Sequence, residues 1–265
     1  MTTVATRARL DAELVRRGLA RSRQQAGELI EQGRVAVRGV VAGKAATVVD
    51  RDTPVVVRDT GEREWASRGA HKLIGALDEL GVVVAGARCL DAGASTGGFT
   101  DVLLERGAAG VVAVDVGYGQ LVWRLRSDER VQVHDRTNVR ALTPHDIGGP
   151  VDLTVADLSF ISLRTVLPAL AACTEGVVLP MVKPQFEVGR ERLGSGGVVR
   201  DPELRLGALV DVTASARVLG LVLRGAAPSP LPGPSGNVEF FLHLTRTGDD
   251  VGDAALAAAV ERGPS

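Results

Sequence analysis

Apolar residues near the start of the chain recur at helical spacing. They predict one helix through RLDAELVRRG, stopping near Gly18, and a second through SRQQAGELIEQG. Ser22 is a good N-cap for the second helix, Gln25 three residues later completes a capping box, and Gly33 suits the position after its last turn. The following RVAVRGVVAGKAATVV alternates and turns at glycines, as short strands do. The pattern predicts a small α+β domain over residues 1–60.

From about residue 68 the pattern changes to an alternation of strands and helices. The predicted helices are HKLIGALDELG, GFTDVLLERG, LRTVLPALAACT and ELRLGALVDVTASARVLG. The predicted strands are RCLDAG, GVVAVDVG, VQVHDRTNVR, VDLTVADLSF, GVVLPMVKPQFE, LVLRGAAPSP and GNVEFFLHLTR. This order predicts an α/β domain over residues 67–248, with a doubly wound, mainly parallel, Rossmann-like sheet. Ligands of such sheets bind at the carboxyl ends of the strands.

Two segments outside these domains have a different composition. DTGEREWAS is polar and turn-like, so we expect a linker over residues 61–66, with Trp65 packed against one of the two domains. Residues 249–265 carry few apolar side chains larger than alanine and valine, and we expect this tail to be disordered.

Charge is distributed unevenly along the chain. The whole sequence has 31 basic and 32 acidic residues, whereas residues 1–44 hold nine basic and four acidic ones. The head therefore carries +5 and the remaining 221 residues carry −6, since the total is −1. A basic head on an acidic body predicts a polyanionic partner for the head. The alternative is a solvated helix face.

Cysteine usage and hydropathy indicate the compartment. Cys89 and Cys173 lie in apolar surroundings without a CxxC partner or neighbouring histidines, so we expect reduced core residues and no metal site. No signal peptide opens the chain, and no uncharged apolar run approaches the ~18–20 residues that a spanning helix needs. We expect a cytoplasmic protein with no membrane partner.

A glycine-rich turn, CLDAGASTGGFTD, follows the first strand of the large domain. It matches neither phosphate-binding fingerprint, and Asp91 stands just before its first glycine. Asp115, Asp135 and Asp157 stand at the exits of later strands. Such a ring of carboxylates repels a pyrophosphate and favours a nucleoside with a cationic appendage. S-adenosylmethionine fits, with an NAD-type cofactor as the main competitor.

The four acids can be assigned to parts of S-adenosylmethionine. An acid at the end of the second strand accepts hydrogen bonds from ribose hydroxyls, which suits Asp115. Asp135 is expected to meet the adenine amino group. Asp91 and Asp157 are expected to face the amino-acid end and the reacting centre.

The residues at the other strand ends indicate which atom receives the methyl group. No cysteine is placed as a nucleophile, and the fourth strand ends in ADLSF rather than the Asn/Asp-Pro-Pro-aromatic loop often used for base nitrogens. A ribose hydroxyl needs a base, such as a lysine that can lose its proton. Candidates at element ends are Lys72, Asp157, Lys183 and Glu239. Lysines and carboxylates grouped in this way can exchange charge.

Several motifs resemble a known family. They are RLDAELVRRGLARSRQQAGELIEQGRVAV, SRGAHKL, DAGASTGGFT, DVGYGQL, ADLSFIS, KPQFEVG and PLPGPSGNVEFF. Residues 67–248 resemble the FtsJ-like ribose 2′-O-methyltransferases, and the head resembles the RNA-binding domain first seen in ribosomal small-subunit protein four. Together they are similar to the TlyA family. The linker reads REWA where a slightly different tetrapeptide is usual, so signalling through it is less secure.

The resemblance implies a class I methyltransferase that uses S-adenosylmethionine. It implies the catalytic set Lys72, Asp157, Lys183 and Glu239. It implies cofactor contacts from Asp91, Gly93, Ala94, Ser95, Thr96, Gly97, Gly98, Asp115, Asp135, Asp157 and Phe160. It implies RNA contacts from Arg9, Arg21, Arg23 and Lys44.

The family methylates cytidine 2′-hydroxyls in ribosomal RNA, on the small subunit and in some members the large one, which sensitises bacteria to capreomycin-type antibiotics. It also carries an old haemolysin label. We expect the target nucleotide to leave its stack, with Trp65, Tyr118, Trp123 or Phe186 available for base stacking. The alternatives are a methyltransferase for protein or small molecules, a membrane-lytic protein, and an RNA chaperone without a cofactor.

Overall fold

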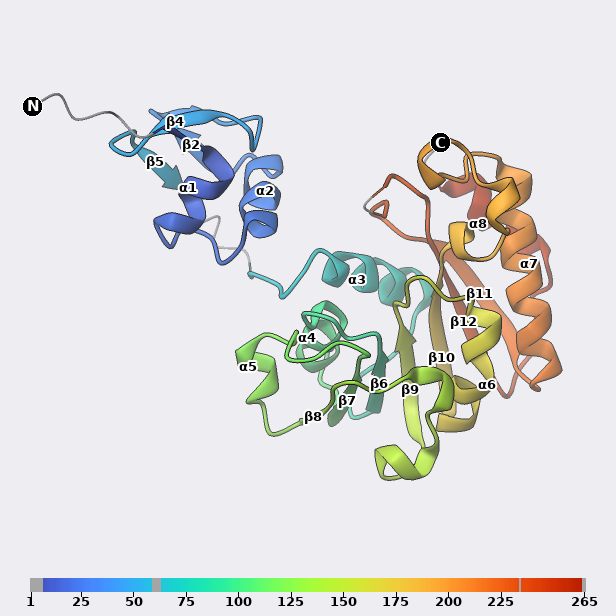
Figure 1. Cartoon of the computed structure of the whole chain (residues 1–265). Helices are drawn as coiled ribbons and strands as arrows, with labels where there is room; N and C mark the ends of the chain where they lie inside the picture. Colours follow the sequence, from blue (N-terminus) through green and yellow to red (C-terminus); the bar gives the residue numbers. More distant parts are fainter. Residues whose placement is uncertain (1–6, 59–62, 234, 264–265) are drawn as a thin grey trace, which may run out of the picture. The chain divides into compact units, whose positions relative to one another are not determined.

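The computed structural model describes residues 7–58, 63–233 and 235–263. The chain divides into two compact units, Met1–Glu64 and Trp65–Ser265. Figure 1 labels most of the helices and strands of both units.

The first unit is a small α+β domain around one apolar cluster that includes Leu10, Leu14 and Ile30. The elements are β1 (Arg7–Arg9), α1 (Leu10–Arg16), α2 (Arg23–Glu31), β2 (Val35–Val37), β3 (Val40–Val41), β4 (Val48–Asp50) and β5 (Val55–Val57). Strand β2 lies between β3 and β5, and β1 pairs with β4, all antiparallel.

The start of α2 differs in detail from the predicted capping box. The Ser22 hydroxyl accepts the Gln25 amide at 3.1 Å, as expected of an N-cap. The Gln25 side-chain oxygen, however, accepts the Arg21 amide at 2.6 Å instead of returning to Ser22. One half of the predicted box is present, and the second bond reaches one residue further back because the glutamine side chain is long.

The second unit contains a seven-stranded sheet, and its helices alternate with most of the strands in the sequence. Its helices and strands are α3 (Gly69–Leu80), β6 (Arg88–Ala92), α4 (Gly98–Glu105), β7 (Gly110–Val114), α5 (Trp123–Arg126), β8 (Val131–His134), β9 (Val151–Ala156), α6 (Leu163–Cys173), β10 (Thr174–Val182), α7 (Pro202–Val218), β11 (Val222–Pro228), β12 (Phe240–Thr245) and α8 (Ala254–Arg262). Short 3₁₀ turns lie at Val139–Ala141, Pro144–Ile147, Pro184–Phe186, Arg190–Arg192 and Ser195–Gly197.

The strand order of this sheet is β11-β12-β10-β9-β6-β7-β8. Strands β6 to β10 run parallel, and β12 is antiparallel to both of its neighbours. The order reverses between β6 and β9, so the crevice beyond their carboxyl ends is where a ligand of this fold binds. The predicted doubly wound sheet is confirmed.

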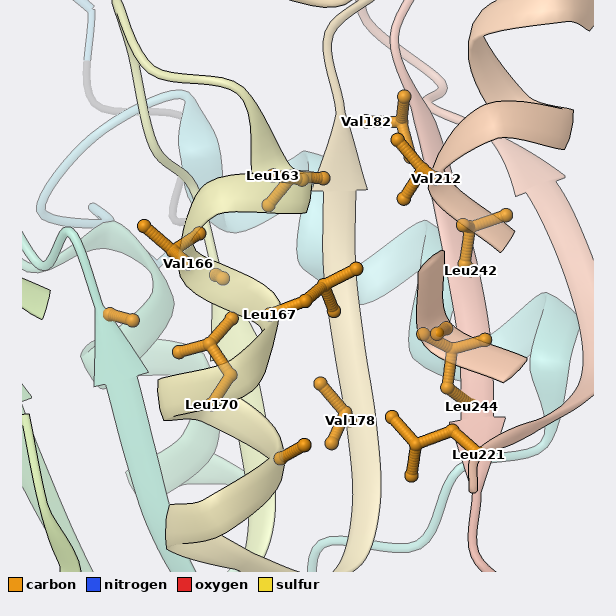
Figure 2. Packing of buried hydrophobic residues seen from close by; sticks show 14 of the residues in the cluster. Leu163, Val166, Leu167, Leu170, Val178, Val182, Val212, Leu221, Leu242 and Leu244 are labelled. Atoms are coloured by element: carbon orange, nitrogen blue, oxygen red, sulfur yellow. The ribbon is translucent and has the colours of Figure 1, made fainter. Parts of the chain in front are cut away.

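Apolar side chains cover both faces of the sheet. On one face α6, α7 and α8 contribute to a cluster that includes Leu167, Leu170, Val212 and Leu242, and Figure 2 shows how these side chains meet. On the other face α3 and α4 contribute to a second cluster. Cys89 and Cys173 are both buried in these clusters, as predicted. The sheet is therefore packed between two helical layers.

The predicted disorder of the tail is wrong. Residues Ala254–Arg262 form α8, which packs against α7 and β11. Leu256 and Ala259 are fully buried, and the Arg262 guanidinium donates to the Ala226 carbonyl at 3.0 Å. The few apolar residues of the tail are spaced as one helical stripe, and alanine is a strong helix former. A few small apolar side chains are therefore enough for this segment to fold as a helix and pack.

The boundary between the units falls inside the expected linker. Residues 61 and 62 lie outside the described residues, and the division comes between Glu64 and Trp65. Trp65 and Ala66 pack against the apolar cluster under α3 and α4, so this tryptophan belongs to the second unit. In the described part of the chain, no helix combines the length and apolarity needed to span a membrane.

Candidate active site

The turn between β6 and α4 brings backbone close to the end of β9. Gly93 has φ +90° and Gly97 has φ +102°, which disfavour other residues. A Cβ at Gly93 would lie 2.5 Å from the Asp157 carbonyl oxygen, so only glycine fits between these strand ends. The predicted cofactor residues of this turn therefore lie along one short loop. They are Asp91, Gly93, Ala94, Ser95, Thr96, Gly97 and Gly98.

Asp91 lies at the base of this loop with an unusual carboxyl group. Its side chain is fully buried, and one oxygen accepts the Thr100 hydroxyl at 2.7 Å. The other oxygen has no hydrogen-bond partner among the described residues. Burial raises the pKa of Asp91 to about 7, and the Thr100 hydroxyl partly opposes this effect. A buried carboxylate oxygen without a partner is costly, which favours binding of a cationic group nearby.

Asp115 lies directly beyond β7 and is fixed by the backbone. Its two oxygens accept the amides of Ser95 at 2.8 Å and Gly117 at 2.7 Å. This places the carboxylate against the glycine-rich loop, where an acid can accept ribose hydroxyls.

Asp135 lies beyond β8 and is engaged by a cation. One of its oxygens accepts the Arg126 guanidinium at 2.9 Å and the Gly119 amide at 3.2 Å. The hydrogen bond from Arg126 is the main cause of the lowered pKa of Asp135. An adenine amino group at this position would share the carboxylate with Arg126.

Two lysine–carboxylate pairs occupy the rim next to the loop. Lys183 Nζ lies 2.6 Å from an oxygen of Asp157 and donates to the Ser159 hydroxyl at 2.9 Å. Lys72 Nζ donates to Glu239 at 2.5 Å. All four side chains predicted as catalytic are therefore engaged in pairs.

The register of the sheet places these pairs side by side. Val182 on β10 lies opposite Phe240 on β12, so Lys183 continues β10 beside Glu239, which precedes β12. Asp157 follows Ala156, which is paired with β6 and with β10. Residues opposite each other in adjacent strands are about 5 Å apart. The structure brings the four residues together with the Gly93 turn at the carboxyl ends of β6, β9 and β10.

The pair formed by Lys72 and Glu239 is shielded from water. The side chains of Lys72 and Glu239 are 10% and 1% exposed, and the second oxygen of Glu239 has no hydrogen-bond partner among the described residues. A Cβ at Gly233 would lie 2.6 Å from that oxygen, so the loop before β12 closes over it. Charges in such surroundings interact more strongly than charges in water.

Aromatic residues near the rim differ in how well they are exposed for stacking on a base. Phe160 is 92% exposed, has φ +64°, and its ring centroid lies 5.3 Å from that of Phe186. Tyr118 and Trp123 are exposed, and the Arg136 guanidinium lies 4.3 Å from the Tyr118 ring centroid. Trp65 packs into the apolar cluster and is less available for stacking than the others.

The four residues expected to contact RNA are exposed on the first unit. Arg9 and Arg23 both donate to the buried carboxylate of Asp11, at 3.1 and 2.9 Å, which holds the two guanidinium groups near each other. Arg21 lies just before α2, and Lys44 lies in the turn after β3. The guanidinium groups of Arg9 and Arg23 retain further N–H donors that can contact phosphate oxygens.

Three residues that hold the site were not identified from the sequence. Thr100 donates to Asp91, Ser159 accepts from Lys183, and Glu187 binds the start of α6. Each of them lies inside a motif quoted above, GGFT, ADLSF or KPQFE. A polar residue inside such a motif is the only local signal for Ser159 and Glu187, because their partners lie 24 residues away in the sequence.

Comparison with known protein families identifies the family of the chain. A model of the FtsJ-like methyltransferases matches residues 65–246, and an S4 domain model matches residues 8–55. A TlyA protein of Mycobacterium tuberculosis is 60% identical over 98% of both chains. The chain belongs to the TlyA family of FtsJ-like methyltransferases.

Other members of the TlyA family carry different names. The M. tuberculosis protein is named a 16S/23S rRNA (cytidine-2′-O)-methyltransferase. Hemolysin A of Brachyspira hyodysenteriae is 36% identical over 89% of this chain and 99% of its own. A solved structure from Streptococcus thermophilus, provisionally named a hemolysin, is 37% identical with a TM-score of 0.77, covering 98% of this chain and 96% of its own. The predicted methyltransferase fold and family are confirmed.

Proposed function

We propose that this chain transfers a methyl group from S-adenosylmethionine to the ribose 2′-hydroxyl of a cytidine in ribosomal RNA. The observation that carries the proposal is the placement of Lys183–Asp157 and Lys72–Glu239 beside the Gly93 turn. The name of the M. tuberculosis relative, at 60% identity, supports the choice of substrate. By analogy we propose action on the small subunit and also on the large one, with an effect on sensitivity to capreomycin-type antibiotics.

The residues around the loop fit S-adenosylmethionine. Asp91 offers a buried oxygen without a partner, which suits the ammonium group, and Asp115 offers acceptors for ribose hydroxyls. Gly93 and Gly97 let backbone approach the ligand, and Phe160 stands at the open edge. When bound, the cofactor supplies an electrophilic methyl group on a sulfonium ion. We propose that this set, with Asp135 and Asp157, holds it.

Lys183 is the group that we propose as the base. Its amine faces two acceptors, the carboxylate of Asp157 and the hydroxyl of Ser159. When the amine is neutral, one N–H can donate to the Ser159 hydroxyl and the other can turn to Asp157 Oδ1, which has no hydrogen bond among the described residues, and one lone pair is left on the nitrogen. The lone pair can then take the proton of the ribose hydroxyl as the oxygen forms its new bond to carbon. Lys72, fixed by Glu239, stabilises negative charge that develops on the oxygen.

The first unit is proposed to bind the RNA substrate. Its arginines contact phosphates, which positions the chain on folded RNA without reading bases. Base recognition then depends on the rim, where Phe160, Phe186, Tyr118 and Trp123 are the aromatic candidates.

The function is tested with purified ribosomal subunits and cofactor carrying a labelled methyl group. We expect label in 2′-O-methylcytidine after digestion of the RNA to nucleosides. Label that survives ribonuclease in the protein fraction would instead support a protein methyltransferase. Absence of cofactor binding by calorimetry would favour an RNA chaperone. Liposome leakage caused by Lys183→Ala protein, with no methylation by the natural protein, would favour a membrane-lytic role.

Cofactor affinity is expected to depend on pH through Asp91. The pKa of its carboxyl group is raised to about 7, so the cofactor-free protein holds a proton there below that pH. A cation binds the ionised form, and binding therefore releases the proton. Affinity should weaken as the pH falls below about 7, by up to about tenfold per unit. Between the ordinary pKa of 3.8 and about 7 the unfolded chain is ionised at Asp91 and the cofactor-free fold is not, so the fold loses stability as the pH rises across this range.

Calorimetry of S-adenosylmethionine binding between pH 5.5 and 8.5 measures this effect, in buffers of different ionisation enthalpy. Asp91→Asn is the control, because it cannot ionise and should bind weakly at all pH values with a flatter profile. Equal pH dependence in the natural protein and in Asp91→Asn would contradict the assignment.

RNA affinity is expected to depend on the arginines that flank Ser22. Arg21→Glu with Arg23→Glu should weaken binding to ribosomal RNA by at least about tenfold and lower the dependence on salt by about one unit of slope per lost phosphate contact. Cofactor binding should be unchanged. Filter binding across a salt series measures the effect.

A matched control places the same change in charge elsewhere. Arg106 and Arg130 are surface residues of the second unit paired with Asp78 and Asp128. Arg106→Glu with Arg130→Glu should weaken RNA binding much less than the change in the head. Equal losses in the two double variants would show that net charge alone governs binding.

A further inference from the structure

Two segments that carry catalytic side chains are linked along their whole length. One follows β9 and contains Asp157–Leu163, and the other follows β10 and contains Lys183–Glu187. Three groups of contacts join them in the same order along both segments. These groups are Asp157 and Ser159 with Lys183, Phe160 with Phe186, and Ser162 and Leu163 with Glu187.

The first segment is held in a strained conformation. Phe160 has φ +64°, a region that bulky residues avoid. Such strain costs on the order of 1–3 kcal/mol and persists only where the surroundings enforce it. The contacts on either side of Phe160 are therefore needed to keep the segment in this shape.

Glu187 makes two of these contacts. Its carboxyl group is buried, accepts the Ser162 hydroxyl at 2.6 Å and accepts the Leu163 amide at 2.7 Å. The Nε atom of Arg164 lies 3.7 Å from the Oε2 atom of Glu187. Burial raises the pKa of Glu187, while the two hydrogen bonds favour the ionised form. An acid at the start of a helix is also stabilised by the helix dipole.

The contact goes beyond an ordinary helix cap. Ser162 already caps α6, since its oxygen accepts the Arg164 amide. Glu187 adds a bond from a different segment, only four residues after Lys183. It therefore joins the two catalytic segments to each other as well as closing the helix.

We propose that Glu187 is a positioning residue, which fixes the segment after β9 so that Asp157 and Ser159 hold the amine of Lys183 for methyl transfer. The inference rests on the proposed function, because it assigns a consequence for that reaction. It adds a residue that touches neither of the two lysine–carboxylate pairs.

Kinetics of Glu187→Ala test the proposal. Removal of both hydrogen bonds should let Asp157 and Ser159 move by a fraction of an ångström or more, which can lower kcat by about 100-fold. KM for RNA and the Kd for S-adenosylmethionine should rise by a smaller factor than kcat falls, because Asp157 and Phe160 are only part of the proposed binding surfaces. Glu187→Gln keeps an acceptor for the Leu163 amide and should recover most of the activity. A kcat near that of the natural protein in Glu187→Ala would overturn the proposal.

A double-mutant cycle distinguishes positioning from a loss of stability. Ser159→Ala and Ser162→Ala should be less than additive in kcat, because Ser162→Ala removes a hydrogen bond of Glu187 and both changes loosen the same hold on Lys183. Full additivity would overturn the proposal. This cycle remains measurable if Glu187→Ala fails to fold.

Asp201→Ala is the matched control for an acid at a helix start. The Asp201 carboxylate accepts the Glu203 amide at 2.8 Å at the beginning of α7. This variant should lower the melting temperature without changing kcat. If the natural protein does not methylate cytidine at all, the proposed function fails. If it does so and Glu187→Ala is equally fast, only the positioning role fails.

Discussion

Replacing Lys183 with arginine should lower methyl transfer by about 10²–10⁴-fold, the usual effect of losing a general base. The guanidinium keeps the positive charge and can still pair with Asp157, so binding of RNA and cofactor should persist. It cannot lose a proton near neutral pH, however, and it has no lone pair to accept one. The variant therefore separates the charge of the lysine from its ability to act as a base.

Single-turnover transfer to saturating ribosomal RNA measures the effect, with a melting curve to verify the fold. The control is the reverse exchange at a surface position, Arg106→Lys, which should leave transfer unchanged. More than about a tenth of the natural rate in Lys183→Arg would contradict a proton-accepting role. That outcome would leave the lysine as a source of positive charge alone.

The lysine content of the chain supports this reading. Of the 31 basic residues only Lys44, Lys72 and Lys183 are lysines, and the others are arginines. Arginine is the cation of other ion pairs in the described part of the chain, as in the pairs of Arg217 with Asp250 and of Arg124 with Asp101. Two of the three lysines meet at the rim of the sheet. A neutral amine is the one property that arginine does not provide.

The residues that meet at the rim could be predicted from the sequence because strand ends are a local property. Asp157 and Lys183 each end a strand, and parallel strands of one sheet end on the same side. The glycine-rich loop was predicted in the same way, since Gly93 and Gly97 occupy turn positions that need positive φ. Local pattern and sheet topology together placed these side chains near one another.

Contacts between distant segments could not be predicted in this way. Ser159 meets Lys183 from 24 residues away, and Glu187 meets Ser162 from 25 residues away. Neither pair follows from periodicity, because it depends on how two loops leave adjacent strands. The prediction of a disordered tail was wrong for a related reason, since α8 is stabilised by packing on α7 and β11 rather than by its own apolar content.

Breaking the buried pair of Lys72 with Glu239 should destabilise the second unit strongly. Lys72→Met leaves a carboxylate that is 1% exposed without its cation. Removing one partner of a buried pair costs about 3–5 kcal/mol, because the other charge stays uncompensated. The variant should also be inactive, but loss of activity alone would not distinguish a catalytic lysine from a structural one.

The double variant Lys72→Met with Glu239→Gln separates the two roles. It leaves no buried charge at this pair, so the free energy of unfolding in urea should return to within about 1–2 kcal/mol of the natural value, because replacing both partners is often nearly neutral. Methyl transfer should remain lost, since no cation is left to stabilise the developing oxyanion. A stable double variant that still methylates RNA would remove this pair from the mechanism. A Lys72→Met protein as stable as the natural one would show that water reaches Glu239.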